Sequence, residues 1–334
     1  MKLRKNQKSL RSRRGVSAVI SNIILNAAVV VVSFGATAID RSIAAFQHSS
    51  SHKVKRQMVN NGNFVCRLRK DKRAVSPAIS TMILTGAIVI MLLVAITFAN
   101  NYLNARVAEN EFNAMKQFMQ TVGLQVDDVA WIPGRTQTVR YASKYGHVKV
   151  ESSVLNYSFY FDNNLRANFT VGTILFNIPV SAYSLGNYYF ERLFPSSDSF
   201  LQNNVSAPIC RVFVVEKMPM LDGSYTRIAV CPLVRQINSV VNNVTYVKLF
   251  LPDLKAGPNP QFSQSVTLTG KNVYRTVHNA NNLTIGLGFP KSLTAGLTPD
   301  FFNFAKTSET LNVPPNSVVE IYAGEVIVSL GLYT

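Results

Sequence analysis

The feature that most constrains this chain is an uncharged stretch, Val75–Ala99, that directly follows a cluster of basic residues. The basic residues of the cluster are Arg67, Arg69, Lys70, Lys72 and Arg73. About 20 consecutive apolar residues are enough to cross the hydrocarbon core of a bilayer as a helix. Lys and Arg resist translocation, so a basic flank keeps its end of such a helix in the cytoplasm. The pattern predicts a membrane helix with the rest of the chain outside the cell.

The net charge of +17 lies almost entirely before this stretch. Residues 1–74 carry 16 Lys/Arg and two acidic residues, a net charge of +14, whereas residues 75–334 carry a net charge of only +3. A nucleic-acid-binding protein needs basic residues on a folded face, preferably with aromatic residues among them. Here the basic residues flank apolar runs instead. The composition therefore argues against a nucleic-acid partner.

A second uncharged stretch, Val16–Ile39, lies within the basic amino-terminal region 1–57. If both stretches were simple spans, the linker Arg41–Arg73 with its nine Lys/Arg would lie outside, against the positive-inside rule. Three interpretations remain open. The first stretch enters and returns as a hairpin, it is processed separately, or the native protein starts later. A start at Met58 would leave a short basic leader over residues 58–74.

Beyond Ala99 the apolar pattern becomes one-sided. The apolar positions follow alternating steps of four and three, which is typical of an amphipathic helix. They are Ala108, Phe112, Met115, Met119 and Val122. We expect one helix over residues 75–122, apolar all round in its first half, with a stop at Gly123. The one-sided half is expected to dock against the domain that follows it.

Residues 124–334 have the pattern of a β-rich domain. Turn signals such as Asp222-Gly223 and Pro314-Pro315-Asn316 separate short runs of β-forming residues. The expected strands include Val148–Val150, Ser153–Phe161, Ile209–Glu216, Thr226–Val230, Val244–Leu251, Ser265–Leu268 and Val318–Leu330. The predicted fold class is α+β: a long amino-terminal hydrophobic helix followed by an antiparallel, β-sandwich-like extracellular domain.

Cys210 and Cys231 lie at the ends of two of these expected strands. If the strands form a hairpin symmetric about Met220 and Leu221, the two cysteines face each other and a cross-strand disulfide is allowed. The alternative is two buried free thiols. The third cysteine, Cys66, lies in the basic leader.

Sequons for N-glycosylation occur in the β-rich region, as expected of a domain exposed outside the cell. The acceptor positions are Asn156, Asn168, Asn204, Asn243 and Asn282.

The motifs of common enzymes are not found in this sequence. His147 and His278 have no zinc-binding spacing, and Gly286–Gly288 lacks the strand, helix and acidic partner of a dinucleotide site. Asp127-Asp128 is expected to be solvated after the helix end. Trp131 is expected to anchor the connection from helix to sheet, with ligand stacking as the alternative. We therefore expect no catalytic, cofactor-binding or metal-binding residues, and no enzymatic activity.

The segment Lys72-Arg73-Ala74-Val75-Ser76-Pro77-Ala78-Ile79, followed by an apolar helix, resembles the leader junction of archaeal type IV pilins. The resemblance implies that a prepilin peptidase cuts between Ala74 and Val75 and leaves the helix on the mature protein. A similar junction at Gly15-Val16 suggests a duplicated signal. Two features depart from the usual pattern: the leader is 74 residues long, and Ile79 stands where bacterial pilins carry a Glu.

From this resemblance we expect a structural or adhesive subunit of an archaeal type IV pilus-like surface filament. The expected partners are the prepilin peptidase, membrane lipid before assembly, and identical or related subunits that pack through the 75–122 helix. The expected location is the cell membrane with an extracellular domain, and the surface filament after assembly. The alternative is a membrane-anchored surface or solute-binding protein that does not polymerise.

Overall fold

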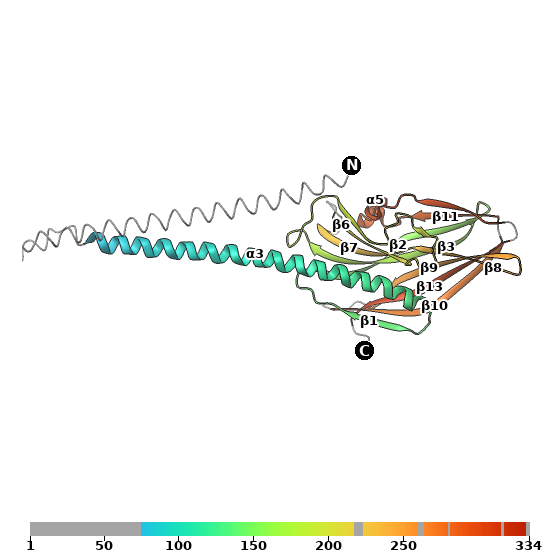
Figure 1. Cartoon of the computed structure of the whole chain (residues 1–334), viewed down its shortest axis with the longest axis horizontal. Coiled ribbons are helices and arrows are strands. Elements are labelled where there is room, and N and C mark those ends of the chain that lie inside the picture. Colours follow the sequence, from blue (N-terminus) through green and yellow to red (C-terminus); the bar gives the residue numbers. More distant parts are fainter. Residues whose placement is uncertain (1–74, 217–222, 259–263, 280, 315–316, 332–334) are drawn as a thin grey trace, which may run out of the picture. The chain divides into compact units, whose positions relative to one another are not determined.

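The computed structural model describes residues 75–216, 223–258, 264–279, 281–314 and 317–331. The first described element is a single long helix, α3 (Val75–Ala130), which ends further along the chain than predicted. The chain consists of two compact units with a boundary between Phe98 and Ala99. The second unit begins at Ala99. That unit contains the carboxyl-terminal part of α3 and the whole β-domain (Figure 1).

The predicted stop at Gly123 is wrong, and the helix continues to Ala130. The chain leaves the helix at Pro133, which disfavours a helical conformation in the residue before it, and at Gly134, whose φ is +83°. Gly123 has a packing role instead. A Cβ at this position would lie 2.9 Å from Cγ2 of Val212 and 3.1 Å from Cζ of Phe194, so only glycine allows the helix to approach the sheet this closely.

The β-domain consists of two mostly antiparallel sheets (Figure 1). The six-stranded sheet has the order β1 (Thr136–Arg140), β10 (Ser265–Asn279), β13 (Val318–Leu330), β9 (Val244–Ala256), β8 (Val234–Val241) and β5 (Leu201–Gln202). The seven-stranded sheet has the order β12 (Ser308–Asn312), β11 (Asn282–Gly288), β2 (His147–Phe161), β3 (Asn164–Pro179), β7 (Tyr225–Pro232), β6 (Cys210–Glu216) and β4 (Tyr189–Phe194). The short helices α4 (Ser292–Ala295) and α5 (Pro299–Phe302) lie between β11 and β12 in the chain. An α+β fold with a long apolar helix before a β-domain is thus confirmed.

Tight turns built from Asn and Asp close two of the hairpins. Asp162 and Asn163 between β2 and β3 both have positive φ, as do Asn242 and Asn243 between β8 and β9. Two successive left-handed residues match the twist of the flanking strands, and Asn and Asp tolerate this conformation best after glycine. The sheets are not wholly antiparallel, because β9 pairs with β13 and β5 pairs with β8 in parallel.

The carboxyl-terminal part of α3 packs against both sheets. The five positions of the predicted apolar stripe, from Ala108 to Val122, are each at most 1 % exposed, which confirms the prediction that this half docks onto the β-domain. The stripe continues through Val126, Val129 and Ala130. It shares a hydrophobic cluster with residues of β3, β6 and β7 on one sheet and of β10 and β13 on the other. We call Ala108–Ala130 the seated segment of α3.

Two glycines of the six-stranded sheet lie against the end of the seated segment. A Cβ at Gly270 would lie 2.4 Å from the carbonyl oxygen of Val129, and a Cβ at Gly324 would lie 2.4 Å from that of Ala130. Because both neighbours are backbone atoms of a packed helix, they cannot rotate away. Together with Gly123 on the opposite side of the contact, these glycines let the helix end fit between the sheets.

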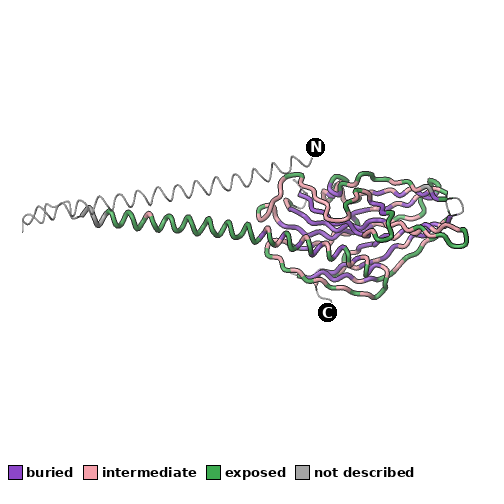
Figure 2. The backbone as a smooth tube through the Cα atoms, viewed as in Figure 1, coloured by how far each residue is buried: buried purple, intermediate pink, exposed green. Residues whose placement is uncertain are grey.

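A second hydrophobic cluster lies away from the helix. It contains residues of β2, β3, β9, β11 and β13, together with an aromatic group around Phe213. The rings of Phe301 and Phe302 lie 5.6 and 6.0 Å from that of Phe213. Every residue of β6 is buried, because α3 covers one face of the strand and this group covers the other (Figure 2).

Replacing Gly324 with alanine tests how tightly the helix end is fitted. We expect Gly324→Ala to lower the free energy of unfolding by about 2 kcal/mol, because the added methyl group overlaps a helix carbonyl. Chemical denaturation of the full chain in detergent micelles measures the change. Gly288→Ala is the matched control, since a Cβ there meets only ordinary contacts at 3.5 Å and beyond. Equal losses in the two variants would contradict this account.

Candidate functional site: the apolar helix

The amino-terminal part of α3 presents apolar side chains all round without covering them. Between Ser80 and Phe98 every residue is exposed except Ala87, which is half-buried (Figure 2). Met82 is 76 % exposed and Ile83 68 %. The sequence carries no charge from Val75 to Ala105. A helix that is apolar on every side needs an apolar surrounding, either lipid or other protein. We call Ser80–Phe98 the apolar segment.

Two threonine hydroxyl groups of the apolar segment donate hydrogen bonds within the helix. The Thr85 hydroxyl donates to the carbonyl oxygen of Thr81 at 2.9 Å, and the Thr97 hydroxyl donates to that of Leu93 at 2.8 Å. In a hydrocarbon surrounding, a polar group without a partner costs several kcal/mol, so such internal bonds are what lipid exposure requires.

The length of the apolar segment fits a bilayer. Its 19 residues span about 28 Å at 1.5 Å per residue, close to the roughly 30 Å of a hydrocarbon core. By length and composition α3 is therefore able to cross a membrane. Polar residues follow the segment in the helix. Arg106 donates to the Tyr102 hydroxyl at 3.1 Å and forms an ion pair of 2.7 Å with Glu109. Tyrosine and arginine are common where a membrane helix meets water.

Asp127 fastens the end of the seated segment to the six-stranded sheet. Its carboxylate accepts two hydrogen bonds from Arg235 of β8, at 2.8 and 3.3 Å, and one from the indole N–H of Trp131 at 2.8 Å. The expectation that Asp127 is solvated is wrong, because the fold places Arg235 of β8 beside its carboxylate. Its neighbour Asp128 is exposed and 3.8 Å from Arg135. Trp131 does lie at the connection from helix to sheet.

Glu111 holds the loop between β1 and β2 against the helix. The carboxylate accepts hydrogen bonds from the backbone N–H groups of Lys144, Tyr145 and Gly146, at 2.9 to 3.1 Å, and from the Ser143 hydroxyl at 2.5 Å. Charge-assisted bonds of this kind are stronger than neutral ones. No sequence motif marks this carboxylate, because its partners lie more than 30 residues away.

Lys116 makes a further contact between the helix and the domain. Its ammonium group donates to the Glu191 carboxylate of β4 at 2.6 Å, and the Tyr189 hydroxyl donates to the same oxygen at 2.9 Å. The seated segment is therefore fixed by polar contacts near both ends as well as by its buried stripe.

The expected processing site lies where the described part of the chain begins. Val75 is the first residue of α3. Ala74, and the alternative pair Gly15 and Val16, lie outside the described residues. The first apolar stretch, Val16–Ile39, lies outside them as well.

Cys210 and Cys231 are both buried free thiols. The predicted hairpin of β6 and β7 forms, but Cys210 pairs with Pro232, and Cys231 pairs with Arg211. This register differs by one residue from the one that would place the cysteines opposite each other. Because side chains alternate along a strand, the shift puts the two thiols on opposite faces of the sheet. Burial raises the pKa of both thiols, that of Cys231 to about 12.

The sequons differ in accessibility. Asn168, Asn204 and Asn243 are exposed, whereas Asn156 and Asn282 are half-buried in strands of the seven-stranded sheet. The amide oxygen of Asn156 accepts a hydrogen bond from the Thr170 hydroxyl at 3.3 Å. The three exposed sites therefore remain the better candidates for a glycan.

The remaining residues considered in the sequence contact aromatic rings or lie within a strand. The ring of His147 lies edge-on to Tyr225 at 6.1 Å, and the ring of His278 lies 4.6 Å from Phe161. Gly286–Gly288 lies within strand β11. Among the described residues, no group of three or more His, Cys, Asp or Glu side chains is placed to hold a metal ion.

Comparison with protein-family models, with curated proteins and with solved structures gives no match for this chain.

The register of β6 and β7 predicts how the thiols react. In the Cys66→Ser variant, we expect a maleimide reagent to label no cysteine of the folded chain, because both thiols are buried. After unfolding without a reducing agent it should label both. Mass spectrometry counts the labels. Absence of labelling after unfolding, with a mass lower by two hydrogens, would show a disulfide and contradict the register.

Proposed function

We propose that this protein is a structural or adhesive subunit of an archaeal type IV pilus-like surface filament. Its helix holds it in the membrane before assembly, with the β-domain outside the cell. The observation that carries the proposal is the division of α3: the apolar segment is uncovered on every side, whereas the seated segment is covered by the chain's own domain. The same uncovered surface suits lipid and, later, copies of itself in a filament core.

Identical contacts between neighbouring subunits would build an open filament. If the apolar segment of one copy packs against those of its neighbours in a head-to-tail arrangement, the contact repeats without closing and gives a helical assembly. Burying such a helix among its copies removes the same apolar surface that lipid covers beforehand. The likeness of Lys72–Ile79 to an archaeal prepilin junction supports this order of events.

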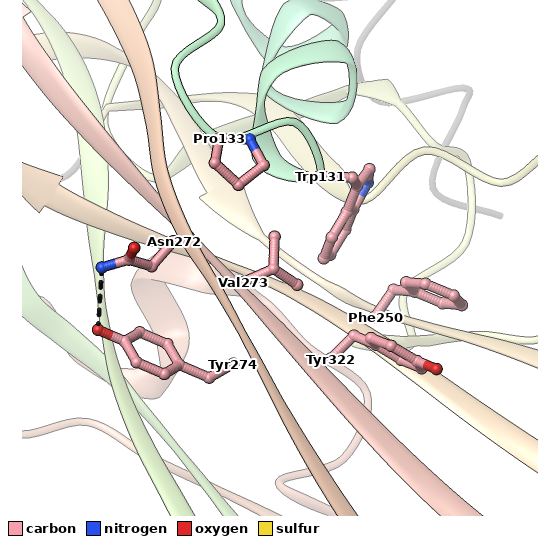
Figure 3. Close-up of a pocket in the computed structure, with 7 residues that line it drawn as sticks. All are labelled: Trp131, Pro133, Phe250, Asn272, Val273, Tyr274 and Tyr322. Carbon is pink, nitrogen blue, oxygen red and sulfur yellow. Dashed lines mark hydrogen bonds between the residues drawn. The ribbon is translucent and has the colours of Figure 1, made fainter.

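A membrane-anchored surface protein that does not polymerise is the second candidate. It is supported by an open hollow of about 680 Å³ on the β-domain, which we call the aromatic hollow (Figure 3). The hollow is lined by Trp131, Pro133, Phe250, Tyr322 and residues 272–274. In this case the apolar segment stays in lipid, and the domain acts by binding at the cell surface.

The amino terminus of the mature protein distinguishes the two candidates. We expect mass spectrometry of the terminal peptide, from sheared surface filaments, to find Val75. Ala74→Leu should block this cleavage, because prepilin-type processing needs a small residue before the cut. Gly15→Leu, at the similar upstream junction, is the matched control and should leave the Val75 terminus unchanged. A chain that keeps residues 1–74 and stays with the membrane after shearing would favour the permanently anchored protein.

A charge in the middle of the apolar segment tests its membrane role. In a chain that starts at Met58, and so lacks the apolar stretch Val16–Ile39, we expect Val89→Arg to reduce the membrane-bound fraction strongly. An arginine at the centre of a membrane helix costs about 2.5–3.5 kcal/mol on insertion scales. Flotation of cell membranes in a density gradient measures that fraction. Asn113→Arg, at an exposed position of the seated segment, is the matched control. Equal membrane binding of both variants would refute an intramembrane position for Val89.

A further inference from the structure

The six-stranded sheet is open at both edges. On one side, β5 pairs only with Val234 and Arg235, so residues 236–241 of β8 have no further strand beside them among the described residues. On the other side, β1 and the residues that lead into it bond to β10 as far as Gly270, which leaves residues 272–279 without a neighbour within the described chain. We call these stretches the β8 edge and the β10 edge. Backbone N–H and C=O groups at an open edge can pair with another strand.

The turn between β8 and β9 fixes which backbone groups face the β8 edge. The turn has two residues, and the residues that flank such a turn form a hydrogen-bonded pair. Because the groups of successive residues alternate in direction, those of Gln236, Asn238 and Val240 point away from β9. The Val234 N–H follows the same alternation, since it donates to the carbonyl oxygen of Phe200 at 3.0 Å, outside this pair of strands.

The neighbouring strand β13 fixes which groups face the β10 edge. The N–H and C=O of Gly270 bond to the residues before β1, so Gly270 makes no ladder bonds with its partner Val326. The extra residue that follows lies on β10, and the alternation along β13 continues unbroken. Through the register of the two strands, the groups of Val273, Arg275 and Val277 therefore point to the open edge.

The two edges run in the same direction. β10 is antiparallel to β13, β13 is parallel to β9, and β9 is antiparallel to β8, so β8 and β10 are parallel to each other. In a filament of the proposed kind all subunits have the same polarity, because their helices enter it from one side of the membrane. Edges that meet between such subunits must therefore run the same way, and these two do.

β10 also runs alongside the seated segment (Figure 1). Gln264, directly before β10, borders a groove together with Ala114, and Gly270 lies against Val129 further along the helix. The open edges therefore extend along the helix. When helices pack side by side, edges in this orientation are placed to face the neighbouring subunits.

Apolar side chains are exposed along both edges. Beyond α3, nine large apolar side chains of the described residues are exposed, and four of the nine lie here. They are Val240 and Val241 on the β8 edge, 69 and 53 % exposed, and Tyr274 and Val277 on the β10 edge, 51 and 45 % exposed. Edges that avoid pairing usually carry charges or proline. The β8 edge carries neither, and the β10 edge carries only Arg275, which Glu320 binds at 2.6 Å.

We propose that the β8 edge of one subunit pairs in parallel with the β10 edge of the next, so that the six-stranded sheet continues from copy to copy. The inference rests on the proposed function and names a contact between the subunits beyond the helix. Like other additions of a strand to an open edge, it takes its strength from backbone hydrogen bonds and its specificity from the side chains.

One register suits both edges. Alternate residues face the core side of the sheet on each strand, beginning with Gln236 and Asn272, and neighbouring residues in a sheet face the same side. Only shifts by two residues are therefore allowed, and each of them also places outward backbone groups of β8 beside inward ones of β10, as a parallel ladder requires. With Val241 beside Val277, apolar residues meet apolar or methyl-bearing ones, whereas a shift of two would bring a polar residue beside Val241. The other pairs in this register are Gln236 with Asn272, Ile237 with Val273, Asn238 with Tyr274, Ser239 with Arg275, and Val240 with Thr276.

This register shifts each subunit along the strands. Within one sheet, the row of paired residues that contains Gln236 reaches β10 at Thr276, four residues beyond Asn272. A subunit whose Asn272 lies beside Gln236 of its neighbour is therefore displaced by about 13 Å, at 3.3 Å per residue. A contact between identical subunits that includes such a shift does not close into a ring, and it gives the open helical assembly of a filament.

Cross-linking of cysteines between subunits tests the contact. Asn238→Cys and Tyr274→Cys, both at exposed positions, are combined in one chain that also carries Cys66→Ser, and filaments on cells are oxidised with copper phenanthroline before shearing. Adjacent strands lie about 4.8 Å apart, so we expect a disulfide between 238 of one subunit and 274 of the next. A non-reducing gel should show a ladder of multimers, and mass spectrometry should identify the linked peptides. Chains with only one of the two new cysteines should stay monomeric.

Two other cysteine pairs are the matched controls. Val240→Cys with Tyr274→Cys is two residues out of register and should leave most of the chain monomeric. Tyr188→Cys with Leu293→Cys, both exposed and outside the six-stranded sheet, should give no ladder.

A proline on the β8 edge gives an independent test. Asn238→Pro removes an N–H that points outward and leaves the bonds between β8 and β9 intact, as a proline at a sheet edge does. We expect far fewer filaments in electron micrographs of these cells, whereas Asn238→Ala should assemble as the unchanged chain does. Far-ultraviolet circular dichroism of both variants in detergent should give the same spectrum, because the domain keeps its own ladder.

Failure of the contact and failure of the proposed function give different results. Filaments without a disulfide between 238 and 274, a ladder from a single-cysteine chain, or equal cross-linking of the out-of-register pair would overturn the inference and leave the proposed function standing. Equal numbers of filaments from the proline and alanine variants would do the same. If the unchanged chain forms no filaments at all, both proposals fail.

Discussion

The burial of the seated segment between the two sheets is the contact on which the rest of the described structure depends. It fixes the carboxyl-terminal part of α3, whereas the apolar segment Ser80–Phe98 is exposed except at Ala87. Each residue of the stripe from Ala108 to Ala130 that is removed from water contributes about 1 to 3 kcal/mol, depending on its size. A contact of this kind is needed because an isolated helix has little stability in water. The domain therefore stabilises this part of the helix, and the helix in turn completes the core of the domain.

Fitting a helix between two sheets imposes close approaches that only glycine allows. Gly123 lies on the helix and faces the seven-stranded sheet, whereas Gly270 and Gly324 lie on the six-stranded sheet and face the helix end. These three positions bring backbone close to its neighbours on two sides. Ion pairs then select the position along the axis: Lys116 meets Glu191, and Asp127 meets Arg235. Apolar packing alone tolerates sliding by a fraction of a turn, but these charged contacts of 2.6 and 2.8 Å do not.

The parts of this structure that local pattern determines could be predicted, and the parts that depend on distant residues could not. The apolar stripe from Ala108 to Val122 repeats within one helix, so its spacing was enough to predict its burial. Gly123 was misassigned as a stop, because a glycine that ends a helix and one that packs against Val212 look alike in sequence. The hairpin of β6 and β7 was predicted, but its register was off by one residue. The segment that would decide the register, residues 217–222, is longer than the two-residue turns whose geometry fixes pairing.

The aromatic hollow could not be predicted for the same reason. Trp131, Phe250 and Tyr322 are far apart in the chain and meet only because β9 and β13 pair in parallel and the helix ends beside them. That meeting also links the hollow to the helix. Asp127 accepts hydrogen bonds from both Trp131 and Arg235, so the carboxylate that fastens the helix end also orients the indole and the guanidinium against Phe250. The position of the helix end therefore also sets the positions of the indole and the guanidinium beside Phe250. The shape of the hollow is thus a consequence of how the helix is seated.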